Sequence, residues 1–115
     1  MRKLTKIALL TVLIVSSTRL AYAQEKLWNE LNTKVVRLYR QGQYSEALKI
    51  AEEALSVAKR TFGSDHPNVA TSLNNLAELY HAQAKYAEAE PLYKQVLTIR
   101  EKALGDQIIP RWRYP

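Results

Sequence analysis

Several residue types are scarce in this 115-residue sequence, and each shortage excludes a class of site. There is no cysteine, which rules out disulfides, thiolate metal sites and a thiol nucleophile. The three glycines are too few for a loop that cradles phosphate. The two histidines, His66 and His81, stand at no recognisable spacing from a nucleophile or a metal-binding partner. The sequence therefore predicts no enzyme, no metal site and no cofactor.

The N-terminal segment has the pattern of a secretion signal. Three basic side chains lie within the first six residues, and Ile7–Val15 is almost wholly apolar. This run is too short to span a bilayer, and the small residues of Ala21-Tyr22-Ala23 suit a signal peptidase. We therefore predict a cleavable signal peptide over 1–23, with Gln24 as the mature N-terminus. Arg19 interrupts the approach to the cleavage site, so an uncleaved inner-membrane anchor is the alternative.

The predicted export destination is the bacterial periplasm or the extracellular medium.

The formal net charge of +6 falls to +2 for the mature chain, because four of the 17 basic residues precede residue 24 and all 11 acidic residues follow it. The remaining +2 is spread in both signs along the chain, as on a solvated helical surface. We expect no nucleic-acid partner, and membrane contact only through the signal segment before cleavage.

The chain repeats itself. Gly42–Ala47 returns as Ala84–Ala89, with Tyr44 and Tyr86 separated by 42 residues, and the register continues to Gly63 and Gly105. Repeat proteins stack helical units and expose extended binding surfaces. The repetition therefore favours a binding protein over a catalyst.

Helical spacing fills the two repeats. Leu73, Leu76, Ala77 and Tyr80 follow i, i+3, i+4, i+7, one apolar stripe of an amphipathic helix, and β-branched residues are too scattered for strands. Turn residues interrupt the pattern at Gly42, at 63–67, at 84–85 and at 105–106, and the three glycines are predicted helix C-caps. The prediction is an all-α domain over 24–106, with helical hairpins at about 28–63 and 68–105, and an irregular tail over 107–115.

Four residues at helix starts have predicted structural roles. Asp65 is expected to cap the following helix, while His66-Pro67 fixes the direction in which the chain enters it. Pro91 is expected near the start of the last helix, where proline is tolerated. Close helix contacts are expected at the small residues Ala47, Ala77 and Ala89. Tyr44 and Tyr86, which follow the inner turns, are expected to fill the gap between the helices of each hairpin.

The pattern resembles the tetratricopeptide repeat, and more narrowly its kinesin-light-chain type. The resemblance rests on Leu73-Asn74-Asn75-Leu76-Ala77, on Ala87-Glu88-Ala89-Glu90-Pro91-Leu92-Tyr93 and on the linker Phe62–Pro67. It implies two tetratricopeptide-type hairpins, a fragment of a right-handed α-solenoid. The first repeat departs from the family by carrying Lys34 where the second has Leu76, as a polar cap would. Residues 107–109 replace the Asp-His-Pro with which a third repeat would begin.

Polar residues beside the packing stripe form a second face. The resemblance implies that this face lines a concave groove, and that an asparagine in the place of Asn75 bonds the backbone of a captured peptide. The alternative is that Asn74 and Asn75 only pack between repeats, since an amide can satisfy either role. The predicted partner-binding residues are Asn75, Asn74, Glu78, Thr71, His81, Asn32, Tyr39 and Arg40.

The predicted function is an exported protein–protein interaction module that captures a peptide or helix of a partner in this groove. The alternative is a structural self-assembly unit that stacks through its uncapped last helix. The tail, with Ile108, Ile109, Trp112 and Tyr114 among arginines, is expected either to dock over the last helix or to be unordered, with an anionic membrane surface as a weaker alternative.

Overall fold

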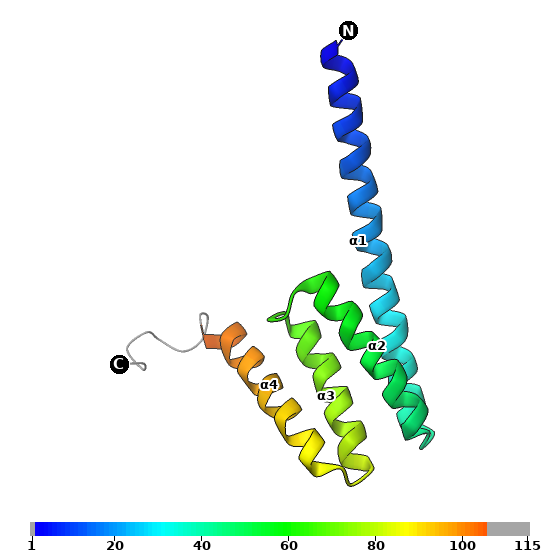
Figure 1. The fold of residues 1–115 in the computed structure, drawn as a ribbon, viewed down its shortest axis with the longest axis vertical. Helices are drawn as coiled ribbons and strands as arrows, with labels where there is room; N and C mark the ends of the chain where they lie inside the picture. The colour runs from blue at the N-terminus through cyan, green and yellow to red at the C-terminus, as the bar shows by residue number, and fades with distance from the viewer. Residues whose placement is uncertain (1, 106–115) are drawn as a thin grey trace, which may run out of the picture.

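The computed structural model describes the backbone of residues 2–105 and the side chains of residues 6–105. These residues form four helices, α1 (Arg2–Arg40), α2 (Tyr44–Phe62), α3 (Pro67–Ala82) and α4 (Tyr86–Gly105), and the described part of the chain has no strand. The helices follow one another as two antiparallel hairpins, and α2, α3 and α4 lie side by side (Figure 1). The predicted all-α fold is confirmed. The predicted tail lies outside the described residues.

Helix α1 is longer than the sequence pattern suggested. It runs for 39 residues without a break at the predicted cleavage site, and its N-terminal part projects beyond the other helices (Figure 1). Its apolar side chains there are solvent-exposed, for example Leu13 at 62%. By length and composition the segment from Lys6 could cross a membrane, a property that signal sequences share. Cleavage after Ala23 stays a prediction.

The core consists of two adjoining clusters that run through the helical layers. One joins Trp28 of α1 to Leu73 of α3 and Ile99 of α4, while the other joins Val35 of α1 to Leu79 of α3. The three alanines predicted at close helix contacts are all buried: Ala47 and Ala77 at 0% and Ala89 at 2% exposure. Small side chains let neighbouring helices approach, so the core depends on them as much as on its leucines.

The turns within the two hairpins use the same backbone conformation with different residues. Gly42 adopts φ 73° after α1, and Ala84, 42 residues later, adopts φ 60° after α3. A left-handed conformation costs alanine about 1 kcal/mol more than glycine, because its Cβ approaches the carbonyl oxygen. Gly63 ends α2 with φ 89°, its N–H donating to the Lys59 carbonyl at 3.1 Å, so this predicted C-cap is confirmed. Gly105 instead stands inside the last described turn of α4.

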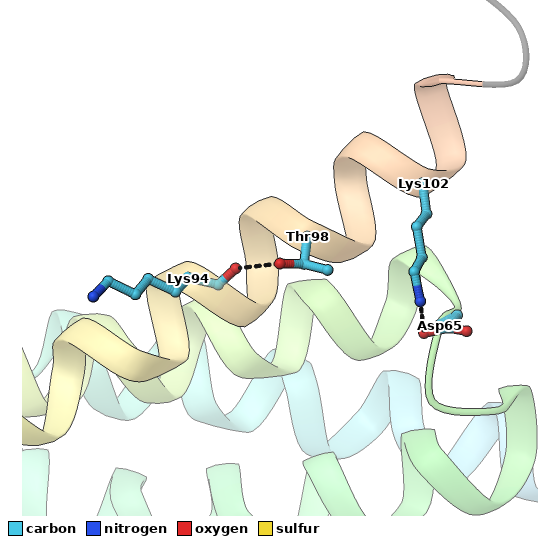
Figure 2. A network of polar contacts seen from close by, with 4 residues as sticks. All are labelled: Asp65, Lys94, Thr98 and Lys102. Atoms are coloured by element: carbon cyan, nitrogen blue, oxygen red, sulfur yellow. Dashed lines mark hydrogen bonds and ion pairs between the residues drawn. The ribbon is translucent and has the colours of Figure 1, made fainter. Parts of the chain in front are cut away.

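The predicted capping role of Asp65 is wrong, because His66 caps α3. The His66 backbone is extended, and its Nδ1 accepts a hydrogen bond from the Asn68 N–H at 3.0 Å. Its ring also stacks on Phe62, with 4.7 Å between centroids. Asp65 stands one residue too early for this bond. Its carboxylate faces Lys102 of α4, 3.5 Å from Nζ, so it links the α2–α3 loop to the end of the last helix (Figure 2).

Helix α4 also departs from expectation at two residues. Pro91 is its sixth residue, beyond the first turn, so the Ala87 carbonyl loses the N–H that would normally bond it. Tyr86, expected to plug the inner turn, is 57% exposed, whereas its counterpart Tyr44 is half-buried against Tyr39. The difference arises because a following hairpin covers α2, and no described element covers α4 in the same way.

Candidate functional site

Two polar contacts join the first helices of the two repeats. The Trp28 indole N–H of α1 donates to the Ser72 hydroxyl of α3 at 2.8 Å, in a buried environment. One turn further along both helices, Asn75 Nδ2 donates to Asn32 Oδ1 at 2.6 Å, in a partly buried one. Together these bonds fix the spacing and register of α1 and α3. The width of any groove between α1 and α3 on this face therefore depends on these two hydrogen-bonded pairs.

A small cavity opens beside the asparagine pair. It has a volume of about 150 Å³ and lies between Val35 and Val36 of α1 on one side and Asn75 of α3 on another. Tyr39, Arg40 and Glu78 complete its lining. The valines supply an apolar floor, and the amide, guanidinium and carboxylate supply hydrogen-bond donors and acceptors at the rim. This mixture suits a peptide segment with one small apolar side chain.

The surface continues along α1 into a second, shallower hollow of about 460 Å³. It shares Asn32, Val36 and Arg40 with the cavity and its asparagine pair, and adds Arg37. Among the described residues that line this hollow, none is acidic. We call the cavity and the hollow together the α1–α3 groove. Neither Arg37 nor Arg40 forms an ion pair with another described residue, and two arginines outnumber the one carboxylate, Glu78, that lines the groove. This end of the groove therefore favours a carboxylate in whatever binds there.

The eight predicted partner-binding residues divide into two groups. Five of them line the α1–α3 groove: Asn75, Asn32, Tyr39, Arg40 and Glu78.

The other three predicted residues are used differently. Asn74 Nδ2 donates to Glu78 Oε1 at 3.1 Å along the exposed face of α3. The Thr71 hydroxyl donates to the Pro67 carbonyl of its own helix at 3.3 Å. His81 packs edge-on against Tyr86 at 4.9 Å between centroids and belongs to a different hollow, along α4. The structure therefore does not gather these three with Asn75 and Asn32.

Tyr93 of α4 lies at the border of the groove. Partial burial raises the pKa of its hydroxyl above the ordinary value of 10.0, and the nearby Glu78 carboxylate and the Tyr39 phenol raise the pKa further. All three causes disfavour a negative charge at Tyr93. Its phenol is therefore a neutral hydrogen-bonding group on α4, near Glu78 of α3 and Tyr39 of α1.

The sequence pattern did not reveal the Trp28–Ser72 bond. Both residues are buried, Trp28 at 7% and Ser72 at 1% exposure, and Ser72 is polar within an otherwise apolar stripe. Buried indole and hydroxyl groups usually find partners. The available signal was the spacing, since Trp28 precedes Asn32 by one turn and Ser72 precedes Asn75 by nearly one turn.

The fold and the groove define a class of protein: a helical-repeat interaction protein in which paired antiparallel helices stack through small residues. Residues 35–102, more than half of the chain, match the tetratricopeptide repeat family. The chain therefore belongs to that family, and the expected resemblance is confirmed.

Relatives share this stretch within much longer proteins. The RxLR effector protein SFI4 of Phytophthora infestans is 30% identical over 90 residues, which is 78% of this chain and 25% of that protein. Protein KINESIN LIGHT CHAIN-RELATED 1 of Arabidopsis thaliana is 30% identical over 96 residues, 83% of this chain and 16% of its own length. The secreted RxLR effector protein RXLR-C07 of Plasmopara halstedii is 27% identical over 92 residues, 80% of this chain and 27% of its own. The chain thus spans about a quarter of these relatives or less.

Proposed function

We propose that this chain is an exported protein-interaction module that captures a partner's extended peptide segment in the α1–α3 groove. The observation that carries the proposal is the asparagine pair at the cavity. The bond at 2.6 Å uses one Nδ2 hydrogen of Asn75 and one lone pair of Asn32 Oδ1. Each amide keeps a further donor and acceptor, enough for a peptide unit to bond on both sides. Packing between repeats and peptide binding are therefore compatible roles.

The charges of the groove suggest the chemistry of the peptide. Val35 and Val36 favour a small apolar side chain in the cavity, and Arg37 with Arg40 favours a carboxylate one or two residues away. We infer a short linear segment that combines an apolar and an acidic residue. Backbone bonding to the asparagines would supply affinity, and the two neighbouring subsites would supply selectivity.

Export is the second part of the proposal. Its supports are the basic and apolar N-terminal pattern, the exposed N-terminal part of α1, and similarity to a relative whose name describes a secreted protein. The destination is the periplasm or the extracellular medium. Sequencing the N-terminus of protein recovered from that fraction should give Gln24. Exported protein that still begins at Met1 would refute cleavage and favour the membrane anchor.

Peptide capture can be tested with a displayed library of random linear peptides and the chain as bait. We expect enrichment of sequences that pair an apolar with an acidic residue. Asn75→Ala should weaken the selected peptides at least tenfold, about the effect of one to two lost hydrogen bonds in a partly buried site. Arg40→Glu should reverse the preference for acidic residues.

Asn29→Ala is the matched control, because it removes an exposed amide from α1 one turn before Asn32 and outside the groove. Circular dichroism on each variant separates lost binding from lost folding. The proposal fails if no peptide is enriched, or if Asn29→Ala and Asn75→Ala weaken binding equally.

A further inference from the structure

A stripe of exposed side chains runs the full length of α4. Its members recur at alternating spacings of four and three residues, the 3.5-residue average of helices that pack along one seam. The α4 stripe consists of Tyr86, Glu90, Tyr93, Leu97, Arg100 and Leu104. The four larger apolar members are 57%, 37%, 58% and 49% exposed in chain order. A hollow of about 350 Å³ lies along the N-terminal half of the stripe. This is a large apolar surface to leave in water.

The same stripe exists in the first repeat, where it is covered. The residues 42 positions earlier lie on α2 and none of them is exposed: Tyr44, Leu48, Ala51, Leu55, Ala58 and Phe62. They belong to the two core clusters to which α3 contributes, through Leu73 in one and Leu76 and Leu79 in the other. The α4 stripe is therefore a helix-packing surface continued from an interface that already exists in the molecule.

The α1 helix of a second copy does not have the side chains to cover α4 as α3 covers α2. Leu76 and Leu79 of α3 are 5% and 0% exposed. The residues 42 positions earlier in α1 are Lys34 and Arg37, both exposed. Burying two cations at this position carries a desolvation penalty that two leucines avoid. Head-to-tail stacking of copies is therefore disfavoured.

The α4 stripe is instead complementary to itself. In an antiparallel pair of α4 helices with its two-fold axis midway between Tyr93 and Leu97, each of these faces the other in the second copy. In the same register Tyr86 of one copy faces Leu104 of the other, because residues 86 and 104, like residues 93 and 97, are equidistant from residue 95. Every apolar member thus meets an apolar member. Antiparallel helices with this spacing interlock side chains along the whole seam.

The charged members of the stripe fit the same register. Glu90 and Arg100 are also equidistant from residue 95, so the Glu90 carboxylate of each copy meets the Arg100 guanidinium of the other. The dimer therefore contains two such ion pairs. Within one chain Glu90 pairs only with Lys94 among the described residues, at 3.3 Å, and both side chains are at least 70% exposed. Such an exposed pair exchanges partners at little cost. Charge and shape therefore select one register and one direction.

We propose that two copies of this chain associate through α4 as a two-fold symmetric antiparallel pair. This interface goes beyond the proposed function: the residues that line the cavity of the α1–α3 groove lie outside the stripe, and Tyr93 is the stripe residue described above at the border of that groove. Closed two-fold dimers are the commonest oligomers because one self-complementary patch completes the assembly. The dimer would present two grooves at once, so that a partner with two copies of the peptide segment would bind with increased avidity.

The test uses the full chain in a mild detergent that solubilises its apolar N-terminal segment. Molar mass by light scattering should show a dimer that dissociates on dilution. Glu90→Arg places two positive charges opposite each other at both ion pairs of the dimer, and Arg100→Glu places two negative charges there. Each variant alone should weaken the dimer about tenfold, as expected when two exposed attractions become repulsions. An equimolar mixture of the two variants should restore dimers, because every pair is again complementary.

Glu53→Arg is the matched control, a charge reversal at an exposed α2 residue outside the equivalent stripe, and it should leave the dimer intact. Leu97→Asp should give a monomer with unchanged helicity, since the side chain is largely exposed. Asn75→Ala should weaken peptide capture at least tenfold and leave dimerisation unchanged, which separates the two proposals. A wild-type monomer, association that no α4 variant alters, or a mixture that fails to restore dimers would each overturn the proposal.

Discussion

The Trp28–Ser72 hydrogen bond should be a main determinant of how the two repeats are held together. Ser72→Ala removes the acceptor and leaves the indole N–H buried without a partner, since Trp28 is 7% and Ser72 1% exposed. An unsatisfied buried donor costs about 1–3 kcal/mol. We therefore expect a loss of about 2 kcal/mol in the free energy of unfolding. With a urea dependence of roughly 1–3 kcal/mol per molar, the denaturation midpoint should fall by about 1 M.

A double-mutant cycle measures the bond itself. Trp28→Phe removes the donor, at the cost of a smaller ring against Phe62, whose centroid lies 5.6 Å from that of Trp28. Once the donor is gone, Ser72→Ala leaves nothing unsatisfied and should cost little. Urea unfolding of all four variants, followed by circular dichroism, should give a coupling energy of about 1–2 kcal/mol.

Equal costs of Ser72→Ala in the wild-type chain and in the Trp28→Phe variant would refute this reasoning. Such additivity would mean that Ser72 acts through packing alone and that the bond at 2.8 Å contributes nothing measurable. If the bond holds α1 against α3, Ser72→Ala should also weaken peptide binding. The asparagine pair one turn away loses its fixed spacing when that restraint is removed.

Three further predictions concern the turns, the α3 cap and Tyr93. Ala84→Gly should raise the free energy of unfolding by up to about 1 kcal/mol because it relieves a left-handed alanine, and Gly42→Ala should lower it by a similar amount, both by urea denaturation. His66→Ala should cost about 0.5–2 kcal/mol by the same assay, whereas His66→Asn should retain most of the cap; equal losses would show that stacking on Phe62 matters more. The raised pKa of Tyr93 means that the folded state holds the phenol proton more tightly than the unfolded chain, so stability is full below pH 10 and falls as the pH rises through the folded pKa. Glu78→Gln should lower that pKa in a tyrosinate absorbance titration, and an unchanged pKa would exclude the carboxylate as a cause.

Much of the fold was predictable because it depends on local spacing. The apolar periodicity of Leu73 to Tyr80 and the turn residues at Gly42 and Gly63 predicted four helices in two hairpins. Each of these signals concerns a single helix or turn, and the 42-residue repeat presents the same pattern a second time. The family resemblance then predicted which faces pack. The length of α1 was not predictable, because the change from an apolar to an amphipathic sequence near Gln24 carries no helix-breaking residue.

The candidate site was predictable only in part. Asn75 and Asn32 were identified because they occupy equivalent positions beside the stripe, nearly 42 residues apart. Thr71 and His81 follow the helical spacing that places them on the same face of α3 as Asn75, yet they do not line the groove. Helical periodicity predicts the face on which a residue lies but not the direction of its hydrogen bonds. The cap was misassigned for a similar reason. Asp65 and His66 are both plausible acceptors in sequence, and only the backbone path decides which of them reaches the Asn68 N–H.

The sequence by itself determined the elements and their pairing, since helix formation and hairpin closure are governed by residues close together along the chain. The tertiary structure alone decided which polar groups meet across the repeats. Trp28 and Ser72 are 44 residues apart, and Asn32 and Asn75 are 43 apart. Their contacts depend on the crossing of α1 and α3, which the packing of small and large side chains over the whole core sets. The same packing buries the stripe on α2 in the core, whereas no described helix packs over its copy on α4.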